Sequence, residues 1–256
     1  MGTLIIPEPG SAISEFDGSL FDQLVEPMRV HRHLYVDEAI FRRELTHIFG
    51  RCWVFVGHES EIPEPQDFKT ITVAKRPLIV TRGKDGKINV IFNRCSHRGT
   101  QICRDEKGNA GVFACPYHGW TFHCDGKLRG QPHPEGYGGK ATDGRWDLGG
   151  AVDVDVYQGL VFAKFAHGGP GLKEYLGHAK PFIDQFMERS DFGPLTATHG
   201  QHRMLIRANW KTVWDNSTDG YHAKSSHRSI TMLSRSRYDR DKSLSHFGGG
   251  SPDDTD

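Results

Sequence analysis

The sequence predicts an α+β protein, in which a small antiparallel β domain is followed by the beginning of an α+β domain. Between residues 68 and 165, short apolar segments alternate with tight turns, a pattern typical of antiparallel sheets. After the glycine-rich segment at residues 168–171 the pattern becomes mainly helical. We therefore expect an N-terminal arm and helix over residues 1–52, the β domain over 53–166 and part of a second domain over 167–256.

The first 52 residues are expected to form an arm and one helix. Residues 1–36 carry Pro and Gly early and resemble an extended arm. From Asp37, which can cap a helix, apolar side chains recur at helical spacing as far as Phe49. Gly50 stands where a helix would stop, and residues 53–57 then have the composition of a strand.

The β domain is expected to consist of short strands joined by tight turns. Gly83-Lys-Asp-Gly86 and Asp125-Gly126 are turn signals. The expected strands lie at residues 70–73, 78–81, 88–93, 111–114, 120–122 and 157–165.

The segment after Gly171 is expected to mix helix and strand. A helix is predicted over residues 172–189 and a strand over 201–208. Residues 209–229 are rich in polar and aromatic side chains and are expected to be partly helical. Residues 248–256 form a polar, Gly-rich tail.

Composition excludes several classes of protein. The 256 residues contain 32 Lys and Arg against 32 Asp and Glu, so no basic surface for nucleic acid is indicated. No apolar run is long enough to span a bilayer, and the N-terminus lacks the features of a secretory signal. We therefore expect a cytoplasmic protein without a membrane partner. Five cysteines, an odd number, argue against a disulfide framework, and together with 15 histidines they point to metal chemistry.

Two short loops each offer one thiolate and one imidazole. They are Cys95-Ser-His97 and Cys115-Pro-Tyr-His118, with 17 residues between His97 and Cys115. Two thiolates suit one iron of a [2Fe–2S] cluster and two neutral imidazoles suit the other. A cluster with two histidine ligands has a higher reduction potential than an all-cysteine cluster, which suits an electron relay.

The residues around the two loops fit the same interpretation. Gly99 and Gly119 allow the backbone to approach a cluster closely, and Trp120 can cover one side of it. Two alternatives remain. The four residues can be ordinary core or surface positions, or they can bind zinc, although zinc knuckles usually pair Cys with Cys and His with His. Cys103 and Cys124 are interpreted as core thiols, and His123 as a surface histidine.

A second candidate site lies at Asp219, His222 and His227. Non-haem Fe(II) oxygenases hold their iron with two histidines and one carboxylate. Asp219 and His222 are three residues apart and would share a helix face, whereas His222 and His227 would lie about 140° apart on an ideal helix. Both histidines can bind one iron only if the helix ends or bulges between them, which Gly220 and the two serines at 225–226 favour. The alternative is a solvated polar helix face.

The segments Cys95-Ser-His-Arg-Gly99 and Cys115-Pro-Tyr-His-Gly-Trp120 closely resemble the Rieske motif. An Asp-x-x-His-x₄-His segment about a hundred residues later, at Asp219 to His227, resembles the catalytic domain of Rieske non-haem iron aromatic ring-hydroxylating oxygenases, large (alpha) subunit. The resemblance extends from the helix before Trp53 to His246. It implies a Rieske [2Fe–2S] domain followed by the beginning of a mononuclear-iron catalytic domain.

The resemblance also implies roles for individual residues. Cys95, His97, Cys115 and His118 match the ligands of the cluster. His222 and His227 match the histidine ligands of the mononuclear Fe(II), and Asp219 matches the catalytic carboxylate that bonds an iron histidine and a cluster histidine of the neighbouring subunit, here His118. Such a route implies a head-to-tail homotrimer, with or without a small beta subunit.

The expected reaction is hydroxylation of an aromatic substrate, including aromatic acids, by O₂ as a monooxygenase or dioxygenase. Electrons would come from NAD(P)H through a reductase or ferredoxin. The family's third iron ligand, a carboxylate, lies far downstream of the two histidines, and Asp253, Asp254 and Asp256 are poor substitutes. We therefore expect a truncated chain with a complete cluster site and an incomplete mononuclear site. The alternative is a Rieske electron-transfer module without oxygenase activity, which would bind two irons per chain instead of three.

Overall fold

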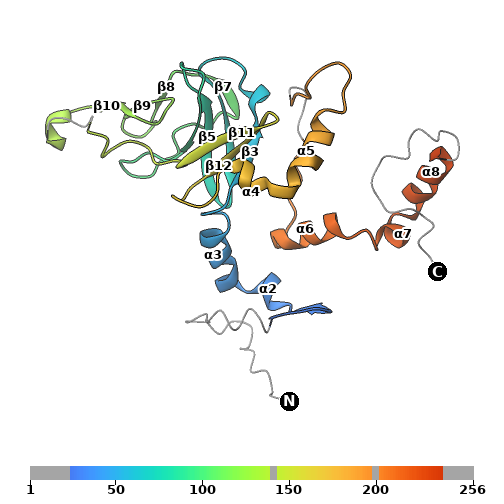
Figure 1. Ribbon diagram of the computed structural model, residues 1–256. Helices are drawn as coiled ribbons and strands as arrows, with labels where there is room; N and C mark the ends of the chain where they lie inside the picture. Colours follow the sequence, from blue (N-terminus) through green and yellow to red (C-terminus); the bar gives the residue numbers. More distant parts are fainter. Residues whose placement is uncertain (1–23, 139–142, 198–201, 239–256) are drawn as a thin grey trace, which may run out of the picture. The chain divides into compact units, whose positions relative to one another are not determined.

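The computed structural model describes residues 24–138, 143–197 and 202–238, and its α+β character confirms the predicted fold class. The chain divides into two compact units. Figure 1 labels most of the helices and strands that they contain. One unit comprises residues 39–202 and contains nearly all of the β-structure; the other comprises residues 1–38 and 203–256. No helix in the described parts of the chain is long and apolar enough to cross a membrane.

Three antiparallel sheets form the unit of residues 39–202. The largest has the strand order β6-β5-β4-β7, and two three-stranded sheets have the orders β11-β12-β3 and β10-β9-β8. The strands are β3 (Val54–His58), β4 (Asp67–Val73), β5 (Arg76–Arg82), β6 (Ile88–Phe92), β7 (Lys107–Asn109), β8 (Val112–Ala114), β9 (Thr121–His123), β10 (Leu128–Gly130), β11 (Asp153–Tyr157) and β12 (Leu160–Lys164).

The helices of this unit lie before and after the strands in the sequence. Helix α3 (Glu38–His47) precedes β3, and the 3₁₀ turns η1 (Glu59–Glu61) and η2 (Pro134–Tyr137) lie between strands. The predicted helix over 172–189 is divided into α4 (Leu172–Leu176), η3 (Gly177–Ala179) and α5 (Lys180–Met187). Gly177 explains the break, because its φ of 47° with ψ of −120° leaves the helical region.

Strand β5 of the four-stranded sheet is buried on both faces, which its sequence explains. Successive side chains of a strand point to opposite faces. In β5, Leu78 and Val80 join one apolar core with Val56 and Val161, whereas Ile79 joins another core. The second core holds the two predicted cysteine loops, so the sheet is the support on which the candidate site is built.

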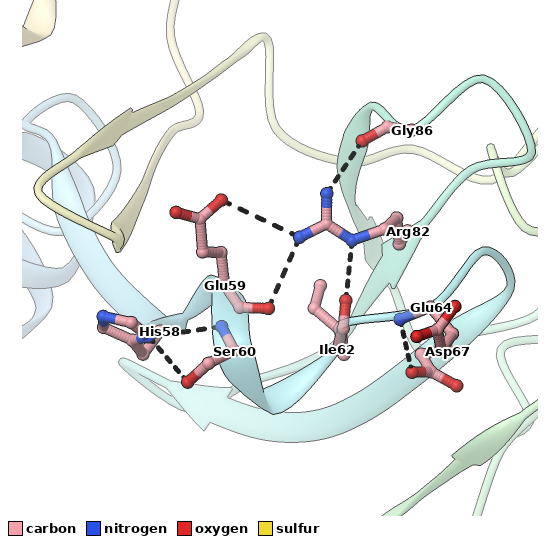
Figure 2. Close-up of polar contacts among 8 residues, drawn as sticks. All are labelled: His58, Glu59, Ser60, Ile62, Glu64, Asp67, Arg82 and Gly86. Atoms are coloured by element: carbon pink, nitrogen blue, oxygen red, sulfur yellow. Dashed lines mark hydrogen bonds and ion pairs between the residues drawn. The ribbon is translucent and has the colours of Figure 1, made fainter. Parts of the chain in front are cut away.

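Arg82 fastens the β3–β4 connection to the β5–β6 hairpin (Figure 2). Its guanidinium donates to the carbonyl oxygens of Ile62 at 2.7 Å, Gly86 at 3.0 Å and Glu59 at 3.4 Å. Next to it, His58 Nδ1 accepts the Ser60 backbone N–H at 3.2 Å and caps η1. These contacts fix the backbone that connects β3, in the β11-β12-β3 sheet, to β4, in the four-stranded sheet.

The other unit is short and mainly helical where it is described. Its elements are β1 (Val25–Glu26), β2 (Arg29–Val30), α2 (His33–Val36), α6 (Trp210–Thr218), α7 (Ala223–Ser226) and α8 (Arg228–Tyr238). The extended arm predicted over residues 1–36 therefore contains a small hairpin and a helical turn in its described part.

The strand predicted over residues 201–208 is wrong for its described residues, 202–208, which form no strand. A strand needs a hydrogen-bonded neighbour, and the apolar residues of this segment are exposed instead, with 93% of Leu205 accessible. The tail at residues 248–256, with its three aspartates, lies outside the described residues.

Candidate metal centres

The two cysteine loops have the same backbone geometry. The N–H of Cys95 donates to the Thr100 carbonyl at 2.8 Å and the N–H of Gly99 donates back to the Cys95 carbonyl at 2.8 Å. In the second loop, Cys115 donates to Trp120 at 2.7 Å and receives from Gly119 at 3.0 Å. Both glycines have left-handed backbones, with φ of 76° and 69°, which explains why glycine stands at both positions.

Each loop is held by a different part of the β unit. The first follows β6, where the buried side chain of Asn93 accepts the N–H groups of Ile102 and Cys103 at 3.1 and 2.8 Å and donates to the Cys103 carbonyl at 2.7 Å. The second loop is the tip of the β8–β9 hairpin, in which Ala114 pairs with Thr121. Hydrogen bonds within the protein therefore hold both loops in place.

The four predicted ligands are brought together by these loops. Cys95 and Cys115 are each 3% exposed, and the rings of His97 and His118 lie 4.7 Å apart between centroids. Burial, with the neighbouring Cys115 thiol as a smaller contribution, raises the pKa of the Cys95 thiol. Burial also lowers the pKa of His97, and the charge of His118 adds to this effect. The lowered pKa favours the neutral, metal-binding form of His97, whereas the raised pKa of Cys95 favours the thiol, whose proton a bound cluster would displace.

One buried nitrogen of His97 is suited to bind a metal. Nδ1 of His97 is buried and has no hydrogen-bond partner among the described residues. A buried polar atom without a partner is costly, and a metal ligand bond would satisfy it. Each iron of a Rieske cluster takes two protein ligands, and the two loops together offer two thiolates and two imidazoles.

Aromatic rings cover one side of the candidate cluster site. Trp120, which is 1% exposed, stacks parallel on His97 with centroids 4.8 Å apart. Trp146 meets Trp120 edge-on at 5.3 Å, and Tyr137 also packs against this core. The role predicted for Trp120 therefore has a structural basis, whereas Tyr137 and Trp146 were not identified from the sequence.

The other side of the site is open. Tyr117 lies over the His118 ring, with centroids 3.8 Å apart, and is 59% exposed. The remaining residues near the motif fit their predicted places: Cys103 and Cys124 are buried core thiols, and His123 is exposed.

The second candidate site shows the predicted helix break. Helix α6 begins after Asn209, whose side chain caps it at 3.1 Å, and ends before Asp219. Helix α7 then ends at His227 after four residues, and α8 begins at Arg228. This interruption brings the rings of His222 and His227 to 5.3 Å between centroids.

Asp219 is positioned to orient His222. Its Oδ1 accepts the Tyr221 backbone N–H at 2.7 Å, and its Oδ2 lies 3.0 Å from His222 Nδ1. The Tyr221 N–H, followed by the His222 side chain, holds the pKa of Asp219 below its ordinary value. An ionised carboxylate on one ring nitrogen leaves the other nitrogen free to bind a metal.

Two parts of the chain match known protein families. Residues 52–153 match the family described as "Rieske [2Fe-2S] domain", so the paired loops belong to a Rieske domain. Residues 195–252 match "Ring hydroxylating alpha subunit (catalytic domain)". The chain therefore belongs to the Rieske non-haem iron ring-hydroxylating oxygenases as an alpha-subunit relative, a family whose cofactors are a Rieske cluster and a mononuclear iron.

Curated relatives and solved structures give the same family. The chain is 38% identical to the N,N-dimethyl phenylurea N-demethylase subunit alpha of Sphingobium sp. (strain YBL2), over 85% of this chain and 48% of that protein. It is 39% identical to the biphenyl 2,3-dioxygenase subunit alpha of Rhodococcus jostii (strain RHA1), over 76% and 42%. Naphthalene 1,2-dioxygenase from Rhodococcus sp. superposes with a TM-score of 0.72 at 37% identity, over 80% and 47%. The chain thus spans about half the length of the curated relatives that it matches.

Proposed function

We propose that this chain carries the electron-accepting and electron-transferring part of a terminal oxygenase that hydroxylates an aromatic substrate. Cys95 and Cys115 would hold one iron of the [2Fe–2S] cluster, and His97 and His118 the other. The observation that carries the proposal is the matching pair of backbone hydrogen bonds in each loop, together with the buried Nδ1 of His97, which has no hydrogen-bond partner among the described residues. The cluster, when bound, supplies one-electron transfer.

The surroundings of the two histidine ligands support a route by which electrons would leave the cluster. Trp120 covers His97 from the core side, whereas His118 lies beside the exposed ring of Tyr117. His118 is therefore the ligand that a neighbouring subunit can approach, after a reductase or ferredoxin, supplied with electrons by NAD(P)H, has reduced the cluster. The same exposed edge would face Asp219 of a neighbouring subunit in a homotrimer, with or without a small beta subunit.

At the second site, His222 and His227 would bind the mononuclear Fe(II), which supplies O₂ activation when bound. Asp219 holds the His222 ring through Nδ1, and so it fixes which nitrogen faces the metal. The named relatives act on a phenylurea, on biphenyl and on naphthalene, all of which contain aromatic rings. An aromatic substrate is therefore the proposed class.

The cluster assignment is tested by iron and sulfide analysis of the anaerobically purified chain. We expect about two irons and two sulfides for the cluster, as in other Rieske centres. Cys95→Ser removes a thiolate and should abolish the cluster. Cys124→Ser is the matched control, because Cys124 is also a buried thiol, 8% exposed, but lies outside the loops. Equal iron and sulfide content in both variants would refute the assignment.

The alternative function is an electron-transfer module without oxygenase activity. Iron stoichiometry separates the two proposals when it is measured in a form of the protein that extends over the full length of its relatives: about two irons per chain are expected for the carrier and about three for the oxygenase.

The proposed bridge is tested in a form of the protein that extends over the full length of its relatives. Asp219→Asn keeps the shape of the side chain but removes its charge, so it should preserve the cluster spectrum and its reduction by the reductase. Reoxidation of the reduced cluster by O₂ with substrate, followed by stopped-flow absorbance, should be slowed and product lost. Reoxidation and product yield equal to the parent would show that Asp219 does not connect the two centres.

A further inference from the structure

Two aromatic rings, those of Trp120 and Tyr137, pack against His97. Trp120 stacks parallel on its ring, with an interplanar angle of 2°. The ring of Tyr137 meets His97 edge-on at 5.9 Å and Trp120 edge-on at 5.3 Å. Trp146 in turn meets Tyr137 edge-on at 6.2 Å, and its carbonyl accepts the Ser96 hydroxyl at 2.6 Å.

The two nitrogens of His97 have different surroundings. Nδ1 is buried without a hydrogen-bond partner among the described residues, whereas Nε2 lies 3.4 Å from the hydroxyl of Tyr137. Metal-bound histidines usually bind the metal through one nitrogen and use the other N–H in a hydrogen bond. The asymmetry therefore assigns Nδ1 to the iron and Nε2–H to the Tyr137 oxygen as donor.

We propose that Tyr137 is a positioning residue for the cluster, and that its hydroxyl accepts the hydrogen bond of His97 Nε2 and thereby lowers the cluster's reduction potential. The inference rests on the proposed cluster ligands. A hydrogen bond accepted from the outer nitrogen makes the imidazole a more basic ligand. A more basic ligand stabilises the oxidised iron relative to the reduced iron, and hydrogen bonding is one of the factors that set the potentials of iron–sulfur centres.

Tyr137 is placed by its own local structure. It is the last residue of η2, which begins with Pro134 at its first position and ends at Gly138 with φ of 80°. The half-buried ring packs against the core cluster that contains Cys95 and Cys115. The hydroxyl is thus held by packing of the ring, and removing the oxygen alone should leave the ring in place.

A second tyrosine, Tyr117, contacts the other histidine ligand and offers a control. The ring of Tyr117 is tilted by 31° against that of His118, with centroids 3.8 Å apart, and the residue is 59% exposed. Tyr117→Phe therefore removes the same oxygen atom from a tyrosine that contacts a ligand ring without the half-buried position of Tyr137.

The test is the midpoint potential of the cluster in the 256-residue chain, measured by anaerobic dye-mediated titration with EPR or circular dichroism detection. We expect Tyr137→Phe to assemble the cluster in full. At a fixed potential its reduced-to-oxidised ratio should rise by roughly threefold, which corresponds to a midpoint potential about 30 mV higher for a one-electron couple. Tyr117→Phe should leave the potential unchanged.

Several results would overturn the proposal. They are an unchanged or lowered potential in Tyr137→Phe, an equal shift in Tyr117→Phe, and loss of the cluster in Tyr137→Phe alone, which would indicate a structural role. A measurement on the unmodified protein is independent of folding in the variants: pulsed EPR of the reduced cluster in H₂O and D₂O should resolve two inequivalent exchangeable imidazole protons. Equivalent protons on the two ligand histidines would contradict the proposed hydrogen bond, which involves His97 alone. Absence of a cluster from the parent chain would instead refute the proposed function.

Discussion

The buried ion pair between Glu61 and Lys69 provides a sharp test of how the β unit is held together. Glu61 Oε2 accepts Lys69 Nζ at 2.6 Å and the backbone N–H of His58 at 2.8 Å. The two side chains are only 14% and 9% exposed. Glu61→Ala would leave an ammonium group and a backbone N–H without their shared acceptor. Breaking such a buried pair costs about 3–5 kcal/mol, a large share of a domain stability of about 5–15 kcal/mol.

The measurement is chemical denaturation of the cluster-loaded chain, followed by tryptophan fluorescence and by visible absorbance. Glu61→Gln keeps one acceptor oxygen and should cost less than Glu61→Ala. The double variant Glu61→Leu/Lys69→Met removes both charges and should recover most of the loss, because an apolar pair avoids the buried unpaired charge. A cost below about 1 kcal/mol for Glu61→Ala, as expected for an exposed pair, would refute the reasoning. So would a double variant whose cost equals the sum of the single substitutions.

Three further predictions concern other parts of the same unit. Hydrogen bonds from Gln158 and Tyr157 hold the pKa of Asp184 below its ordinary value, so Asp184 stabilises the fold above that value and the effect is lost as the pH falls through the depressed pKa. Tyr157→Phe should raise this pKa and move the loss to higher pH, which carboxyl NMR titration measures; an unchanged pKa would contradict it. Trp120→Ala should destabilise the chain by about 3–5 kcal/mol in urea unfolding and speed cluster loss to a chelator; an unchanged rate of loss would show that Trp120 does not shield the site. Arg82→Met should cost about 2–3 kcal/mol in the same unfolding assay, because three backbone carbonyls lose a charged donor; a cost near zero would show that the connection holds without it.

The strands with strong apolar runs were predictable from sequence, and those that depend on tertiary partners were not. The run Leu78-Ile-Val80 predicts β5 because it is buried on both faces. Strand β11, Asp-Val-Asp-Val-Tyr, was missed although it alternates polar and apolar residues. The β4–β5 turn at Ala74 and Lys75 was also missed, because both residues have positive φ, of 50° and 66°, where Asn-Gly is the usual signal.

At the candidate sites, ligands that lie close together in the sequence were predictable, whereas contacts between residues far apart in the sequence were not. The Cys95 and Cys115 loops were recognisable because each places two ligand types within four residues, and the break before His227 was predictable from helix geometry. Tyr137 reaches His97 across 40 residues of sequence, and no local pattern connects them. The binding of metal by the named residues stays a prediction.

The most direct test of the central claim is the Mössbauer spectrum of the chain reconstituted with ⁵⁷Fe. One iron bound by Cys95 and Cys115 and another bound by His97 and His118 have different electronic surroundings. We predict two distinct iron signals of equal area in the oxidised protein, and localisation of the added electron on the histidine-bound iron after reduction. A single iron signal, as from a cluster with four equivalent ligands, or a chain that retains zinc and no iron, would contradict it.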